Sequence, residues 1–335
     1  MMAQHEQNTE FMWKLYNPSI PSFIHDLACT PAIQRLKGVG MNCGCEYTSF
    51  PLFKNLKNYS RYSHSIGCAL IVWKFTQDVK QTIAALLHDI STPTFAHVID
   101  FLNGDYMKQE STESGTVTTI EASSEIMTML NTIGLTLKDV ADYHQYPIAD
   151  NDSPKLSADR LEYTLTNIVN YHIAPYEKAK VWFDNLVADS NEHNEEELMF
   201  SNLDIAEQFS LAALHTSRIY VADEDRFAMQ SLAELLKKHI ARGILNVADL
   251  YRTEKEVISL LSNDTMATAD WNQFRQLRHI FSGSDHPEAK VVIAKKRYIN
   301  PYILGMGRVS DHSATFAKAL RSFLETPLDK PLWAE

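Results

Sequence analysis

The sequence of 335 residues is poor in the residues that build fibrous, disulfide-rich and membrane-spanning proteins. It contains only 4 cysteines, 11 glycines and 12 prolines, which excludes a disulfide framework, a collagen-like repeat and a low-complexity chain. No stretch approaches the ~18 consecutive apolar residues of a membrane-spanning helix. The 31 lysines and arginines are outnumbered by 42 aspartates and glutamates, so a broad basic face for duplex nucleic acid is not expected.

What the chain does contain is typical of a globular protein, with 45% hydrophobic and 22% charged residues. Its first residues lack the basic and then apolar pattern of a secretion signal, and few cysteines suit a reducing compartment. We therefore expect a cytoplasmic protein with free thiols and no membrane partner. The Cys43-x-Cys45 pair has no second cysteine pair at a metal-ligand spacing, so it predicts small buried residues near a turn.

Apolar residues recur at spacings of three and four, which predicts a mainly helical fold with few strands. The clearest helical stripes lie within 66–73, 83–87, 126–133 and 161–169, and further amphipathic helices are expected at 196–218, 223–241 and 253–262. The alternation over 291–303 predicts a small β hairpin. The acidic run Asn191–Glu197 predicts a solvated loop that leads into a helix.

The sequence contains two His-Asp dipeptides, a pair that is expected about once by chance. His25-Asp26 has no partner histidine at a suggestive distance, and we interpret it as a turn or helix end. His88-Asp89 ends the apolar run TIAALLHD, which predicts a buried helix end, and the Thr-Pro sequence that follows predicts the start of a new helix. A divalent cation would satisfy both buried groups of this pair. The alternative is a hydrogen bond that ties two helices together.

Two further predicted helices carry residues that complete a cation site. In RYSHSIGCAL, His64 follows Arg61 by three residues, so the two share a helix face. In KLSADRLEYTLTN, Tyr163 follows Asp159 by one turn. Together with the His88-Asp89 pair, His64 and Asp159 give two imidazoles and two carboxylates from three helices. A metal ion held by these four groups would keep coordination positions for water and substrate. The candidate metal ligands are His64, His88, Asp89 and Asp159.

The order and spacing of these residues resemble the H…HD…D pattern of the HD-domain phosphohydrolases, most closely the dNTP triphosphohydrolases. The resemblance covers roughly residues 20–175, through TPAIQRLKGVG, RYSHSIG, AALLHDISTPTFAHVID and SADRLEY. It implies an all-α HD-domain helical bundle whose candidate ligands hold one divalent ion (Mn, Fe, Ni, Zn or Mg). We expect an N-terminal segment 1–19, an HD phosphohydrolase core 20–185, and a C-terminal helical region 186–335 with a short β hairpin, packed with the core as one unit.

The resemblance also implies roles for residues outside the ligand set. His97 and Asp100 match the second histidine and aspartate of the family's active site, which makes His97 the general acid, kept cationic by Asp100. Gln34 and Arg61 match residues that contact the sugar and the phosphates, and Tyr163 matches a tyrosine of the sugar pocket.

The sequence departs from the triphosphohydrolase pattern at two positions. Thr92 and Ile120, the latter before Glu121, stand where many of those enzymes have histidine, so fewer phosphate contacts are expected. Lys155 and Arg160 are secondary phosphate candidates.

The leading hypothesis is a metal-dependent nucleotide phosphohydrolase, most like a dNTP triphosphohydrolase that releases nucleoside and tripolyphosphate. In it, water activated by the metal ion attacks phosphorus. The alternatives are a nucleoside monophosphatase or another phosphomonoesterase, and a non-catalytic protein that binds metal or nucleotide. The expected partners are a nucleotide or another phosphorylated small molecule and further copies of the chain in a homo-oligomer.

Overall fold

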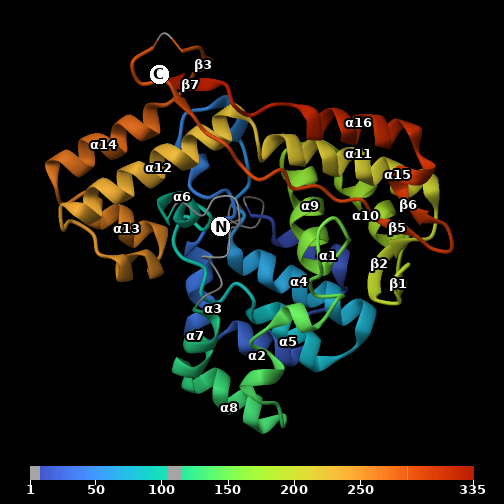
Figure 1. Cartoon of the computed structure of the whole chain (residues 1–335). Helices are drawn as coiled ribbons and strands as arrows, with labels where there is room; N and C mark the ends of the chain where they lie inside the picture. The colour runs from blue at the N-terminus through green and yellow to red at the C-terminus, as the bar shows by residue number, and fades with distance from the viewer. Residues whose placement is uncertain (1–7, 104–114, 285) are drawn as a thin grey trace.

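The computed structural model describes residues 8–103, 115–284 and 286–335; of the predicted N-terminal segment 1–19, residues 1–7 lie outside the described residues. Helices dominate the described part, as predicted (Figure 1). The α-helices are α1 (Trp13–Tyr16), α2 (Ser22–Ala28), α3 (Pro31–Gln34), α4 (Arg61–Thr76), α5 (Val79–Leu87), α6 (Val98–Asn103), α7 (Thr116–Ala122), α8 (Ser124–Thr132), α9 (Ala158–Asn170), α10 (Tyr176–Asp184), α11 (Leu203–Ile219), α12 (Asp223–Ala241), α13 (Glu254–Leu261), α14 (Thr265–Gln276), α15 (Val309–His312) and α16 (Ala314–Glu325).

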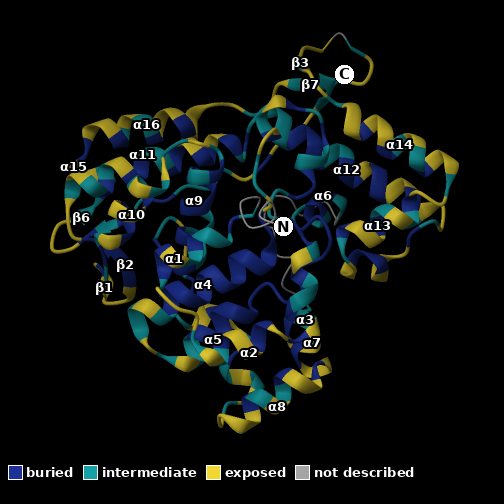
Figure 2. Ribbon diagram, turned by 180° about the vertical axis from the view of Figure 1, so that it is seen from behind, coloured by how far each residue is buried: buried dark blue, intermediate teal, exposed yellow. Residues whose placement is uncertain are grey.

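Helices α4, α5 and α9 form the centre of the molecule and are dark with buried residues in Figure 2. Each begins at a polar N-cap, respectively Ser60, Asp78 and Ser157, whose side chain accepts a hydrogen bond from a backbone N–H of the first turn. Helix α4 packs against both α5 and α9. A Cβ atom at Gly67 would lie 2.5 Å from the Glu162 side chain, so only glycine permits this approach of α4 to α9.

The buried apolar residues form two clusters. One surrounds α4, α5, α9, α11 and α16, and the other surrounds α6, α12, α13 and α14. Both clusters take residues from either side of position 185, so the predicted boundary is not marked by a break in the core, and the domain division stays a prediction. Throughout the described ranges, every helix is too short or too polar to span a bilayer.

The strands are short and form two small sheets. They are β1 (Leu186–Ser190), β2 (Glu196–Phe200), β3 (Ile280–Ser282), β4 (Lys290–Val291), β5 (Tyr302–Ile303), β6 (Gly307–Arg308) and β7 (Pro331–Ala334). The sheet orders are β1-β2-β5-β6 and β3-β7-β4. Strands β1 and β2 form an antiparallel hairpin, and β2 pairs in parallel with β5.

Two predictions for the acidic region are wrong. Residues 196–200 form strand β2 rather than the start of a helix over 196–218, and the run Asn191–Glu197 belongs to the β1–β2 hairpin rather than to a loop before a helix. Glu197 is fully buried because Arg308 lies 2.6 Å from its carboxylate. This partner lies 111 residues away, so the local charge pattern could not reveal it.

The hairpin predicted over 291–303 is also displaced. The chain between β4 and β5 is extended without pairing, and the hairpin joins β5 to β6 instead. The alternation in this segment reflects side chains such as Val292 and Ala294, which are buried, between exposed neighbours. Figure 1 shows this orange segment crossing the molecule between the two groups of helices. That path brings it beside the candidate site.

Candidate active site

Helices α4 and α9 place His64 between two carboxylates. Its Nε2 lies 2.9 Å from Asp159 Oδ1, and its Nδ1 lies 2.6 Å from Glu162 Oε2. Burial alone would lower the pKa of His64, but Cys68 and these carboxylates raise it well above its ordinary value. His64 and Asp159 are therefore in direct contact through Nε2 and Oδ1.

Glu162 supports His64 from behind and was missed at the sequence level. Tyr59 donates a hydrogen bond to Glu162 Oε2, and Thr166 donates to Oε1 at 2.8 Å. With its carboxylate held in this way, Glu162 accepts from His64 Nδ1 and leaves Nε2 directed toward Asp159. Its position three residues after Asp159 was the available signal, because residues so spaced share a helix face.

His88 and Asp89 enter the site at the end of α5. His88 Nδ1 donates to the Ala85 carbonyl at 2.7 Å, which leaves Nε2 open, 3.4 Å from Asp89 Oδ2 and 3.9 Å from Asp159 Oδ1. Burial would raise the pKa of Asp89, but Arg61, 3.0 Å away, together with His88 and His64, holds it well below its usual range. Asp89 is therefore ionised at neutral pH.

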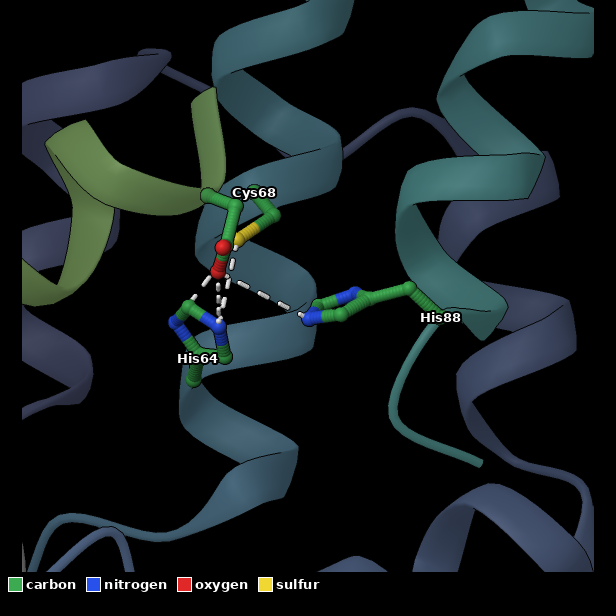
Figure 3. Close-up of side chains that lie close together, drawn as sticks. His64, Cys68 and His88 are labelled. Atoms are coloured by element: carbon green, nitrogen blue, oxygen red, sulfur yellow. Dashed lines mark hydrogen bonds and ion pairs between the residues drawn. The ribbon is translucent and has the colours of Figure 1, made fainter. Parts of the chain in front are cut away.

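The structure brings all four predicted ligands together. Ligand atoms of His64, Cys68, His88 and Asp159 lie within 4.8 Å of one another, and Asp89 Oδ2 lies 3.9 Å from His64 Nε2. In Figure 3, His64 and Cys68 lie one above the other on one helix and His88 points toward them from a second helix. In both histidines Nδ1 is bonded to the protein and Nε2 faces the carboxylates, at 2.9 Å from Asp159 Oδ1 for His64 and 3.4 Å from Asp89 Oδ2 for His88. Two such imidazoles and two carboxylates fit a divalent metal ion.

Cys68 is an additional member of this cluster, and we had expected only a free thiol there. Its Sγ lies 3.6 Å from both ring nitrogens of His64, which places the sulfur against the ring rather than along the lone pair of Nε2. Burial raises the pKa of the Cys68 thiol, although His64 partly offsets this effect. The position suits a packing contact that keeps the His64 ring in place.

The four predicted ligands line a cavity of about 500 Å³, and Arg61, His97 and Tyr163 line it as well. Gln34, which was expected to contact the substrate, is not among the residues around this cavity. Its amide donates to the Ala28 carbonyl at 2.6 Å and to the Tyr62 hydroxyl at 3.4 Å. These local bonds occupy its side chain, so we leave it out of the site.

His97 stands at the edge of the cavity, just before α6. The helix begins at Val98 and does not include Pro93 in its first turn as predicted, because Phe95 and Ala96 have positive φ values of 61° and 45°. His97 Nδ1 nevertheless lies 2.9 Å from Asp100 Oδ2, and Asp100 is fully buried.

The surroundings of His97 act in opposite directions on its pKa. Burial lowers the pKa of His97 below its ordinary value, and the attraction of Asp100 does not make up for this loss. The nearby charges of Arg297 and Arg61 lower the pKa further. Asp100 raises the pKa of His97 against these effects, and a bound anion would also favour the protonated ring, so the cationic general acid stays a prediction.

The extended segment between β4 and β5 adds cationic residues that sequence reasoning did not assign to the site. Lys295 and Arg297 line the cavity, and Arg297 is close enough to influence the pKa of Tyr163. Arg160 also lines it, with Nη1 3.0 Å from Asp150 Oδ1. Lys155 instead pairs with Glu195 at 2.5 Å, outside the cavity lining. The signal for Lys295 and Arg297 was the basic run KKR, which has no helical spacing.

No family model matches the chain. It is 26% identical over 245 residues to the uncharacterized protein YdhJ of Bacillus subtilis, covering 72% of this chain and 71% of that protein. It is also 26% identical over 257 residues to the metal-dependent phosphohydrolase cns2 of Cordyceps militaris, covering 75% of this chain and 68% of that protein.

Two solved structures share the fold over almost the whole chain. A hypothetical protein from Aquifex aeolicus superimposes with a TM-score of 0.62 at 16% identity, covering 94% of this chain and 92% of that one. A phosphohydrolase from Bacteroides thetaiotaomicron superimposes with a TM-score of 0.63 at 13% identity, covering 94% and 96%. The expected likeness to metal-dependent phosphohydrolases is thus confirmed at the level of the broad class, while a special closeness to dNTP triphosphohydrolases stays a prediction.

Proposed function

We propose that this protein is a metal-dependent nucleotide phosphohydrolase that cleaves the bond between phosphorus and the 5′ oxygen of a nucleoside. The enzyme class agrees with the relatives named phosphohydrolase. One observation carries the proposal. His64, His88, Asp89 and Asp159 converge on one side of a cavity that also contains a histidine–aspartate pair and cationic side chains.

The proposed roles of the metal ligands follow from the bonds they make. Glu162 and the Ala85 carbonyl hold Nδ1 of His64 and His88, so that each Nε2 is presented to the cation. A divalent ion held there supplies a water of lowered pKa and neutralises charge on a phosphoryl oxygen. Thr92 donates to Asp89 Oδ1 at 2.6 Å and orients that carboxylate.

The cationic residues bind and orient the phosphate. Arg61 lies 3.0 Å from Asp89, and its Nε is buried without a hydrogen-bond partner in the described part of the chain. A phosphate oxygen beside this edge of the guanidinium would satisfy it. Arg297 adds positive charge to the same cavity, which a protein of formal charge −11 must supply locally.

His97 is the proposed general acid. A substrate phosphate raises its affinity for a proton, and Asp100 accepts from Nδ1, so that Nε2 carries the proton to the leaving oxygen. Tyr163 lines the cavity beside these groups and is the proposed contact to the sugar. Positioned acids of this kind contribute roughly 10²–10⁴ in rate.

The number of phosphates in the substrate separates two forms of the proposal. The cationic lining supports a dNTP, cleaved to nucleoside and tripolyphosphate. Thr92 and Ile120 favour a nucleoside monophosphate instead, because Thr92 is bonded to Asp89 and Ile120 is fully buried in the apolar core. The expected homo-oligomer stays a prediction.

The decisive experiment is product analysis. Purified protein is incubated with Mn, Fe, Ni, Zn or Mg and with dNTPs, NTPs and nucleoside monophosphates, and the products are separated by ion exchange. Tripolyphosphate supports the triphosphohydrolase form, and orthophosphate from monophosphates supports the phosphatase form. Metal content and nucleotide-dependent thermal stabilisation without any product would favour the non-catalytic binding protein and contradict the proposal.

A further inference from the structure

The cavity extends far beyond the metal ligands along α9. Asp159, Tyr163, Asn167 and Tyr171 are spaced four residues apart, and all four line the cavity. At a rise of about 1.5 Å per residue, the backbone advances about 18 Å from Asp159 to Tyr171. A lone phosphate would occupy only the end at Asp159. The cavity therefore has a far end, which we define as Asn167, Tyr171, Tyr220 and Asp225.

Aromatic rings and an open acceptor characterise this far end. Asn167 Nδ2 donates to the Tyr220 hydroxyl at 2.8 Å, while Asn167 Oδ1 is buried without a hydrogen-bond partner among the described residues. Tyr220 also packs edge-on against Tyr163, with ring centroids 6.2 Å apart. The tyrosine rings can pack against a flat ring of a ligand. The unpaired amide oxygen of Asn167 can accept a hydrogen bond from the same ligand.

Asp225 is a second acceptor without a donor. It lies in the first turn of α12 and lines the cavity, and within the described ranges its carboxylate takes part in no hydrogen bond or ion pair. The neighbouring Arg226 is engaged elsewhere, with Asp223 at 2.5 Å and the Val221 carbonyl at 3.1 Å. Burial raises the pKa of Asp225 well above its ordinary value, and Arg226 only partly offsets this.

The two ends of the cavity therefore suit different parts of a ligand. Arg61 and Arg297 favour a phosphate near the metal ligands, whereas the far end presents the unpaired oxygens of Asn167 and Asp225, which accept hydrogen bonds. We infer that the far end binds the base of the nucleotide and selects bases with an exocyclic amino group, which donates a hydrogen bond to Asp225. This inference rests on the proposed function for the orientation of the ligand. It names the base as the part of the substrate that determines specificity.

Cytidine and uridine test this inference because cytidine carries an amino group at the ring position where uridine carries a carbonyl oxygen. Binding of each nucleoside to the full-length protein is measured by titration calorimetry, which requires neither metal nor turnover. We expect cytidine to bind at least ten-fold more tightly than uridine. Asp225→Asn should weaken cytidine binding roughly two- to ten-fold, the range for a hydrogen bond between neutral groups, and should narrow the difference in affinity between cytidine and uridine.

The matched control is Glu224→Gln, which makes the same change from carboxyl to amide one residue earlier in α12, outside the cavity lining. It should leave both affinities unchanged. Adenosine and inosine differ in the same way on a larger ring. Their affinities for the unaltered protein give a second test, which does not depend on whether Asp225→Asn folds.

Equal binding within both nucleoside pairs, no nucleoside binding, or unchanged cytidine affinity in folded Asp225→Asn would overturn the inference. The proposed function fails separately, if the protein hydrolyses neither nucleotides nor p-nitrophenyl phosphate with any metal.

Discussion

The two histidine–carboxylate pairs of the cavity differ in the freedom of their rings. His64 is 1% exposed and held on both nitrogens, by Glu162 and Asp159, whereas the His97 side chain is 23% exposed and held only through Nδ1 by Asp100 among the described residues. Their pKa values move in opposite directions, up for His64 and down for His97. A ring fixed on both sides suits a permanent ligand, and a ring with one free nitrogen suits proton transfer.

The largest expected effect separates these two roles. His64→Ala removes a ligand, so it should lose the metal ion and with it all measurable hydrolysis. His97→Ala should keep the metal content and lose roughly 10²–10⁴ of kcat, because only proton transfer is affected. Metal content by mass spectrometry and initial rates are measured on the same preparations. Loss of metal from His97→Ala would break the distinction between the pairs.

Removing the support behind His64 should have a smaller effect. Glu162→Gln weakens the bond to Nδ1 and should reduce metal affinity by roughly 10–100-fold, the range typical of such supporting carboxylates. Competition with a chelator measures this affinity, and a thermal melt checks the fold. The exposed Glu177→Gln is the matched control and should bind metal like the unaltered protein. Equal affinities in both variants would mean that Glu162 plays no part in metal binding.

The pH profile should sharpen the comparison further. Since burial lowers the pKa of His97, its protonated fraction falls as pH rises, and kcat/KM should decline at a lower pH than an ordinary histidine would give. Asp100 raises the pKa of His97, so Asp100→Asn should shift the decline in kcat/KM to still lower pH. A shift toward higher pH would show that His97 is not the group that titrates.

The carboxyl pair Glu46 and Glu254 contains no histidine. A substitution there should have the smallest effect on activity, and its effect should be on stability instead. Burial and the neighbouring Glu254 raise the pKa of Glu46 from 4.5 to about 8. The folded protein therefore keeps a proton that the unfolded chain loses, so this contribution is full below about pH 4.5 and is lost as pH rises through about 8. Glu46→Gln should flatten the decline of Tm over this window, an effect on the order of a few kcal/mol. An unchanged decline would contradict this account.

The helices that carry the proposed ligands were predictable because their sequence signals are local. Apolar spacing and polar caps define α4, α5 and α9, and His64, His88 and Asp159 sit at fixed positions on or beside those stripes. When these three helices pack together, their buried polar side chains must find hydrogen-bond or charge partners. We therefore expect these side chains to face one another.

The parts that were missed depend on contacts between distant segments. Glu162 appears as an ordinary helix residue until His64, 98 positions earlier, is seen against it. Arg297 lies in the segment between β4 and β5, which has no helical spacing. It reaches the cavity only because this segment crosses the molecule. Gln34 shows the opposite case: its amide donates to the Ala28 carbonyl and it does not line the cavity, so its contact with the substrate stays a prediction.

The most direct test of the account is anomalous diffraction from crystals soaked in Mn or Zn. The account predicts one strong peak between Nε2 of His64 and His88 and the carboxylates of Asp89 and Asp159, at bonding distance from each. A peak elsewhere, or no peak at these four side chains at saturating metal, would contradict it.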